Sequence, residues 1–173
     1  MSEVNVYLDL EGEPLRVGTV HRTPGRGFEV VSFEYGSQPK ADLMQLFRRM
    51  AFTVLVSNVD DHLRNHAFLY EGIQGWRLSP AYDLNPTPAD VRERRLTTNL
   101  TIDDGTCDLD VLIEAAEQMG IAHPQARQVI GEVALVTNRW RSAADRMGAP
   151  RGEIERMASA FEHSDLQRAL ALA

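Results

Sequence analysis

Three side chains with oxygen donors follow one another closely in the middle of this sequence. Asp60 and Asn65 stand five residues apart in a D-x-x-x-x-N arrangement, and Asp83 comes later in the same chemically dense segment, 52–86. Protein kinases carry their parts in this order: a loop Asp accepts the proton of the substrate hydroxyl, an Asn holds magnesium, and a later Asp holds the magnesium that bridges the phosphates. Magnesium also prefers carboxylate and amide oxygens. The spacing therefore predicts half of a phosphotransfer site.

Two predicted elements would position these residues. Apolar residues recur at spacings of three and four from Lys40 to Val56, which predicts an amphipathic helix of about four turns that delivers the segment 58–61 at its end. We expect this helix to be the buried spine of its lobe, with Phe52 among its core residues. The runs AFLY (67–70) and WRLS (76–79) predict a hairpin that separates Asn65 from Asp83.

At these residues a resemblance to a known family becomes specific. The runs N-x-D-D-H-x-R-N and W-R-L-S-P-A-Y-D-L-N-P resemble the catalytic and metal-binding segments of HipA-type toxin kinases. The matching positions are Asn58, Asp60, His62, Asn65, Pro80, Tyr82 and Asp83. The resemblance is dense over 52–86 and weaker over the rest of 40–170, and residues 1–35 are similar to the opening β-rich subdomain of that family.

The resemblance implies a serine/threonine protein kinase that uses ATP and Mg²⁺. It implies Asp60 as catalytic base, Asn65 and Asp83 as magnesium ligands, and Asn58, His62 and Tyr82 as supporting residues. It further implies a small helix-turn-helix antitoxin as partner, as in a type II toxin–antitoxin system, and a protein substrate from the translation machinery.

The wider pattern predicts an α+β fold in two parts. Residues 1–36 carry three β-rich runs, 4–10, 14–20 and 28–35, which predict an antiparallel meander; the segment 36–39 predicts a linker. Residues 40–173 form the predicted kinase-like lobe, with a strand or extended segment at 95–102. Proline at the start and glycine at the end punctuate three further predicted helices, 108–120, 124–147 and 152–170.

Some parts of a kinase have no counterpart in these 173 residues. Lys40, at the predicted linker, is the only lysine, and no glycine-rich loop precedes the catalytic segment. Positioning and charge neutralisation supply most of phosphotransfer catalysis, so we expect weak ATP binding and weak or no transfer by this chain alone. A phosphate-binding element, if present, would lie among Arg22, Gly25, Arg26 and Gly27. These observations favour an alternative for the isolated chain: a non-catalytic module that binds an antitoxin or a kinase partner.

Other interpretations of the same residues remain open. Asp60 and Asp61 could cap a helix that begins near His62. His62 and His66 have the spacing of a zinc helix, but Leu63 stands where the Glu of a zinc protease belongs. A metal-dependent hydrolase could use Asp60, Asp61 and Asp83.

A basic run follows the predicted site. Arg92, Arg94 and Arg95 are expected to form a solvated face rather than a phosphate clamp, although kinases bind their substrates with the segment after the metal-binding Asp.

Composition sets outer limits on function. A net charge of −7 argues against direct binding of nucleic acid, because neutralising phosphates supplies most non-specific affinity. No run of 18 apolar residues and no export signal occurs in the sequence, and the single Cys107 excludes an internal disulfide. We therefore expect a cytoplasmic protein that does not span a membrane.

Overall fold

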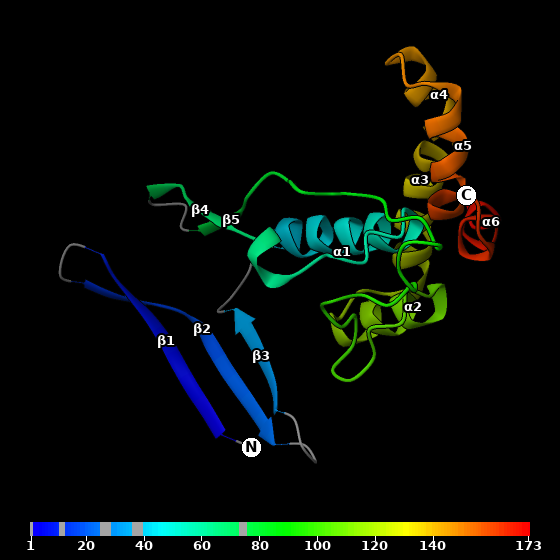
Figure 1. Cartoon of the computed structure of the whole chain (residues 1–173). Helices are drawn as coiled ribbons and strands as arrows, with labels where there is room; N and C mark the ends of the chain where they lie inside the picture. The colour runs from blue at the N-terminus through cyan, green and yellow to red at the C-terminus, as the bar shows by residue number, and fades with distance from the viewer. Residues whose placement is uncertain (1, 11–12, 25–28, 36–39, 73–75) are drawn as a thin grey trace. The chain divides into compact units, whose positions relative to one another are not determined.

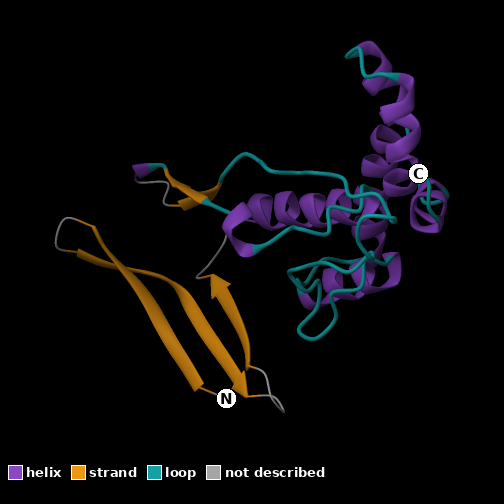
Figure 2. Cartoon of the chain, viewed as in Figure 1, coloured by secondary structure: helices purple, strands orange, loops and turns teal. Residues whose placement is uncertain are grey.

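The computed structural model describes residues 2–10, 13–24, 29–35, 40–72 and 76–173. The chain divides into two compact units, Met1–Lys40 and Ala41–Ala173. The strands of the first unit are blue in Figure 1, and the second unit consists of helices, one short hairpin and long loops (Figure 2). This content confirms the predicted α+β class.

The first unit is a three-stranded antiparallel meander. Its strands are β1 (Ser2–Leu10), β2 (Glu13–Pro24) and β3 (Glu29–Tyr35), in the spatial order β1-β2-β3. The register of β1 shifts between Val6 and Tyr7, which is the mark of a bulge. The predicted strands are confirmed, although β2 is longer than expected and places Arg22 opposite Val31 of β3. The predicted linker 36–39 lies outside the described residues, and so do Gly25, Arg26 and Gly27.

Helix α1 (Lys40–Leu55) is the core element of the second unit. Phe47, Ala51, Val54 and Leu55 are completely buried, and they pack against residues of the later helices. The predicted helix is therefore confirmed, but Phe52 lies only partly buried at the edge of this core. The fully buried ring of α1 belongs to Phe47 instead.

A short hairpin is fastened to the first turn of α1. Strands β4 (Phe68–Tyr70) and β5 (Trp76–Leu78) pair in antiparallel register, as predicted. Asp42 of α1 is buried, and Arg77 Nε shares its N–H between both oxygens of the Asp42 carboxylate, each at 3.0 Å. The same carboxylate accepts a hydrogen bond of 3.3 Å from the Leu78 amide. Charge-assisted bonds of this kind fix direction as well as distance. The start of α1 thus determines where the chain leaves the hairpin.

A long irregular segment joins the hairpin to the next helix, α2 (Leu109–Gln118), and is drawn as a teal loop in Figure 2. The stretch 95–102, predicted as a strand or extended segment, forms turns and bends, with one isolated bridge between Arg95 and Thr106. The reason is a tight local reversal, in which the amides of Leu96 and Leu100 donate to the carbonyls of Gly105 and Asp104. The backbone N–H groups of Leu96 and Leu100 thereby have hydrogen-bond partners without a neighbouring strand.

The remaining helices form two groups. α2 packs against α3 (His123–Thr137) and α6 (Ser164–Leu170), whereas α4 (Trp140–Arg146) packs against α5 (Arg151–Phe161). Gly131 of α3 permits a close approach of the chain's end, since a Cβ there would lie 2.9 Å from Ala173 Cα. No helix in the described part of the chain is both long and apolar enough to cross a bilayer.

Two predicted long helices are each broken into two. The break at 138–139 separates α3 from α4, where the Trp140 ring stacks on Phe161 of α5 with centroids 4.4 Å apart. The break at 162–163 separates α5 from α6, and extended His163 caps α6 by accepting from the Leu166 amide. At the first break a tertiary contact between rings overrides the local helical pattern, and at the second a side-chain cap starts a new helix.

Candidate functional site

The loop after α1 leaves the hydrophobic core before it reaches the surface. Ser57, in the left-handed conformation at φ 54°, ends the helix, and the Asn58 amide still donates to the Thr53 carbonyl at 2.9 Å. Ser57, Asn58 and Val59 are each at most 1% exposed. The base of this loop is therefore held by the core, and the exposed part begins at Asp60.

Arg94 supports the same helix end from the irregular segment. Its guanidinium donates to the Val54 carbonyl at 3.2 Å, to Ser57 Oγ at 3.0 Å and to the Asp165 carboxylate at 2.7 Å. A cation beside the last carbonyls of a helix is favourable because it offsets the negative end of the helix dipole. The expectation that Arg94 belongs to a solvated face was therefore wrong. No sequence pattern would have singled out Arg94, because Asp165 lies in the last helix of the chain.

The two neighbouring aspartates point in different directions. The Asp60 side chain is 70% exposed, and its nearest charged partner is Arg92, with 3.2 Å between Nη1 and Oδ1. The Asp61 side chain is 11% exposed and binds His66 Nε2 at 3.0 Å and Thr53 Oγ1 at 3.3 Å. The Asp60 carboxylate is thus accessible from solvent, whereas the Asp61 carboxylate is held by its contacts with His66 and Thr53.

The two histidines of the loop make different contacts. The ring of His62, a predicted supporting residue, has its Nδ1 buried without a hydrogen-bond partner among the described residues. The backbone carbonyl of His62 accepts from the Asn65 amide at 2.8 Å, and this bond closes the 3₁₀ turn η1 (Leu63–Asn65). The ring that braces the loop belongs to His66, through Asp61. Asn65 is held in place by this turn and is 7% exposed.

The loop that carries Asp83 is bonded to the segment 57–67 at several points. The Tyr82 hydroxyl donates to the Arg64 carbonyl at 2.6 Å, the Ser79 amide to the Ala67 carbonyl at 2.8 Å and the Thr87 amide to the Ser57 carbonyl at 3.1 Å. The structure therefore brings together the segments 57–67 and 79–87, which carry the three predicted site residues. Tyr82, predicted as a supporting residue, makes one of the contacts between them.

Asp83 itself has an unusual backbone. Its φ is +55°, a left-handed conformation that residues other than glycine adopt rarely, and its carboxylate accepts from Asn85 Nδ2 at 2.6 Å. Strained backbone of this kind is concentrated at functional sites, where the surrounding structure enforces it. Carboxylate and amide oxygens, such as those of Asp83 and Asn65, are the ligands that suit Mg²⁺. In the described part of the chain no group of three His, Cys, Asp or Glu is arranged to hold a metal.

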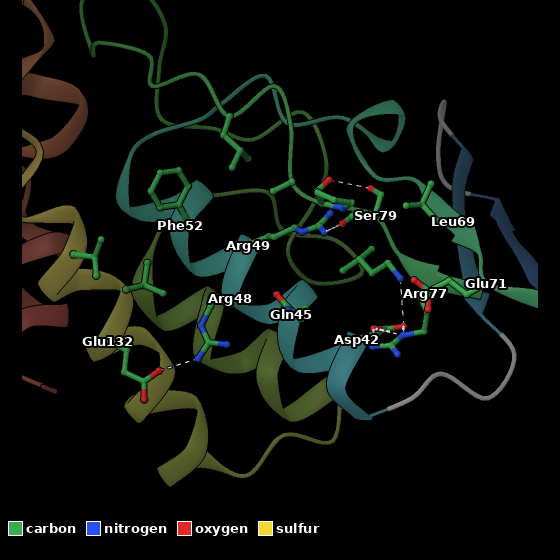
Figure 3. A pocket seen from close by; sticks show the side chains of 16 residues that line it. Asp42, Gln45, Arg48, Arg49, Phe52, Leu69, Glu71, Arg77, Ser79 and Glu132 are labelled. Atoms are coloured by element: carbon green, nitrogen blue, oxygen red, sulfur yellow. Dashed lines mark hydrogen bonds and ion pairs between the residues drawn. The ribbon is translucent and has the colours of Figure 1, made fainter. Parts of the chain in front are cut away.

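A cavity in the described part of the chain lies apart from these residues. It has a volume of about 780 Å³ and lies between α1, the hairpin and α3. Figure 3 shows Arg48 paired with Glu132, Arg77 paired with Asp42, and Arg49 directed toward the Ser79 carbonyl. Burial lowers the pKa of Arg49, and neighbouring Asp61 opposes that shift. Asp60, Asn65 and Asp83 do not line this cavity.

The family model of the HipA-like C-terminal domain matches residues 27–161, which is most of the chain. This chain belongs to the HipA-like C-terminal domain family. The HipA-like match includes the loop 58–65, the hairpin and the Asp83 loop.

One curated protein is similar over a short stretch of this HipA-like chain. It is named "Putative kinase Y4dM", from Sinorhizobium fredii (strain NBRC 101917 / NGR234), and is 43% identical over 47 residues. The match covers 27% of this chain and 12% of the relative, so the two proteins are compared over only a small part of the relative's length. No solved structure gives a significant match to the chain.

Proposed function

We propose that this HipA-like chain carries the catalytic-base and magnesium-binding half of a serine/threonine protein kinase. The observation that carries the proposal is the joining of two loops: the segment with exposed Asp60 and buried Asn65 is bonded to the segment with Asp83 through Tyr82 and Arg64. Family membership supports the kinase class, as does the name of the similar protein.

In the proposed reaction each residue has a separate role. Asp60 accepts the proton of a substrate hydroxyl while that oxygen forms a bond to the γ-phosphorus of ATP; the bond from this phosphorus to the β-phosphate oxygen breaks, and ADP leaves with the electron pair. Asn65 and Asp83 would hold Mg²⁺, whose charge offsets that of the phosphates. Ser57 and Arg94 anchor the loop base so that Asp60 keeps its position. Orientation of this kind contributes a large share of catalysis.

The second candidate is a non-catalytic module that binds an antitoxin or a kinase partner. The single lysine, Lys40, lies at the start of α1, so within this chain a lysine cannot pair with the phosphates beside Asp60 in the way kinases require. We accordingly propose weak transfer by this chain alone. As a toxin–antitoxin component, it would bind a small helix-turn-helix protein and act on a protein of translation.

Magnesium binding provides the direct test. Titrating Mg²⁺ into the ¹⁵N-labelled chain should shift the amide signals of residues 58–65 and 82–85. Asn65→Ala and Asp83→Asn should each weaken Mg²⁺ binding about tenfold or more, which is the loss of roughly 1.4 kcal/mol or more expected when one of two side-chain ligands is removed. Asp145→Asn, an exposed aspartate of α4, is the matched control and should leave the affinity unchanged. If Mg²⁺ shifts no signals in these loops, or if both site variants bind as the parent does, the proposal is wrong.

Transfer itself distinguishes the two candidates. Radiolabelled phosphate transfer from ATP should be weak or undetectable for the chain alone. Labelling that is robust and disappears in Asp60→Asn would show that the chain is an active kinase and would overturn the second candidate. If the chain binds an antitoxin or a kinase partner and also binds Mg²⁺, but transfers no phosphate under any condition, that result would instead support the non-catalytic binding module.

A further inference from the structure

The arginine that faces Asp60 is placed there by its surroundings. Arg92 lies nine residues after Asp83 in the chain, and its guanidinium contacts Asp60 at 3.2 Å and Thr97 Oγ1 at 3.4 Å. Thr97 in turn is bonded to the catalytic loop, because its amide and its hydroxyl both donate to the Val59 carbonyl at 3.0 Å. Arg92 thus reaches the same loop directly and through Thr97.

The backbone before Arg92 is also fixed. Pro88 is buried, and its carbonyl accepts from the amides of Val91 at 3.0 Å and Arg92 at 3.3 Å. The Ala89 amide donates to Ser159 Oγ of α5 at 3.0 Å. A turn anchored to a helix therefore carries Arg92, and this limits where its side chain can reach.

The ion pair between Arg92 and Asp60 contributes too little to the stability of the fold to explain its presence. The two side chains are 49% and 70% exposed, and exposed ion pairs contribute little to stability. Its length exceeds the roughly 2.7–2.9 Å of a strong charge-assisted bond. Arg92 uses two of its nitrogens in these long contacts, and a guanidinium has five N–H donors. An arriving ligand could take over these donors at little cost.

The position of Arg92 determines which ligand that would be. If Asp60 accepts a hydroxyl proton, the phosphoryl group that the hydroxyl oxygen attacks must lie close to Asp60, and so within reach of a guanidinium already in contact with the carboxylate. Guanidinium groups suit phosphate because their planar fork donates two parallel bonds to its oxygens. Arginine also stabilises the charge on a transferring phosphoryl group in other phosphotransfer enzymes.

We infer that Arg92 binds the terminal phosphate of a nucleoside triphosphate at Asp60, supplying the cation that no lysine of this chain provides there. This inference rests on the proposed function. It also gives the three neighbouring arginines different roles, since Arg94 supports the core, Arg95 is exposed, and Arg92 belongs to the site. By contacting both Asp60 and the terminal phosphate, Arg92 would hold that phosphate beside the residue that accepts the hydroxyl proton.

The test compares Mg²⁺ alone with Mg²⁺·ATP. Amide shifts of the labelled chain are followed to millimolar ligand for the parent, Arg92→Gln, Arg92→Lys and the control Arg127→Gln, an exposed arginine of α3. We expect Arg92→Gln to bind Mg²⁺ as the parent does, within about twofold, but to bind Mg²⁺·ATP about tenfold more weakly, a loss of about 1.4 kcal/mol, because a charged hydrogen bond to the phosphate is removed. Arg92→Lys should restore part of the loss, because it keeps the charge without the fork.

Each outcome decides between explanations. If Mg²⁺·ATP binds to Arg92→Gln and Arg127→Gln equally well, Arg92 is a surface residue and the inference is wrong, while the proposed function stands. If Arg92→Gln weakens Mg²⁺ alone as much as Mg²⁺·ATP, Arg92 only shapes the loop, and phosphate binding is again excluded. Absence of Mg²⁺ binding in the parent chain overturns the proposed function and this inference together.

Discussion

Arg94→Met is the substitution whose cost follows most directly from the contacts. It removes four contacts of the guanidinium: 3.0 Å to Ser57 Oγ, 2.7 Å to Asp165, 3.2 Å to the Val54 carbonyl and 3.7 Å to Cys107 Sγ. The Asp165 side chain is 4% exposed, so the change leaves a buried carboxylate without its closest partner. Breaking a buried pair in this way costs about 3–5 kcal/mol.

Two features refine this expected loss. Arg168 Nη1 lies 3.6 Å from Asp165 Oδ1 and would still offset part of the charge, which places the expected loss near 3 kcal/mol, the lower end of the range for a broken buried pair. Replacing both partners with apolar residues, as in Arg94→Met with Asp165→Leu, is expected to recover most of the loss, because a buried pair exchanged for apolar groups is often neutral. About 1 kcal/mol would remain, since Asp165 also accepts from the Leu109 amide at 3.3 Å.

Urea unfolding followed by circular dichroism at 222 nm measures these differences, provided that the m-value stays constant. Arg95→Met, at the exposed position directly after Arg94, is the control and should change the free energy of unfolding by less than about 0.5 kcal/mol. The reasoning fails if Arg94→Met costs no more than Arg95→Met, or if the double variant is as unstable as Arg94→Met.

Three further outcomes follow from burial. Phe47→Ala should cost about 3–5 kcal/mol and partly buried Phe52→Ala clearly less, by urea unfolding; equal losses would contradict the placement of these rings. Burial raises the pKa of the Cys107 thiol to about 11, with Asp165 adding to the rise, so the folded chain at pH 8 should react with a thiol reagent far more slowly than the urea-unfolded chain. Burial, with the charge of Arg94, lowers the pKa of His163 from 6.5, so the unfolded state takes up the proton first as the pH falls below about 6.5. Stability should therefore decrease from pH 7.5 to 5.5, and His163→Gln should reduce that decrease; an unchanged pH dependence in the variant would refute it.

The sequence by itself determined the elements around the site. The spacing of apolar residues in α1 and the β-rich runs of the hairpin are local signals, because each depends on residues a few positions apart. The order of Asp60, Asn65 and Asp83 is likewise a property of the sequence, and it led to the HipA-like family that the comparison then established. What each of these three residues does remains a prediction.

Tertiary structure decided which of several equivalent side chains face the site. Asp60 and Asp61 are identical in type and adjacent, yet only the fold turns one toward Arg92 and the other toward His66. The same holds for Arg92 and Arg94, whose partners lie 32 and 71 residues away in the chain. The helix break at 138–139 also lies beside such a distant contact, between Trp140 and Phe161. Local propensities differ by less than about 1 kcal/mol per residue, so a stacked ring or a capped helix end is enough to override them.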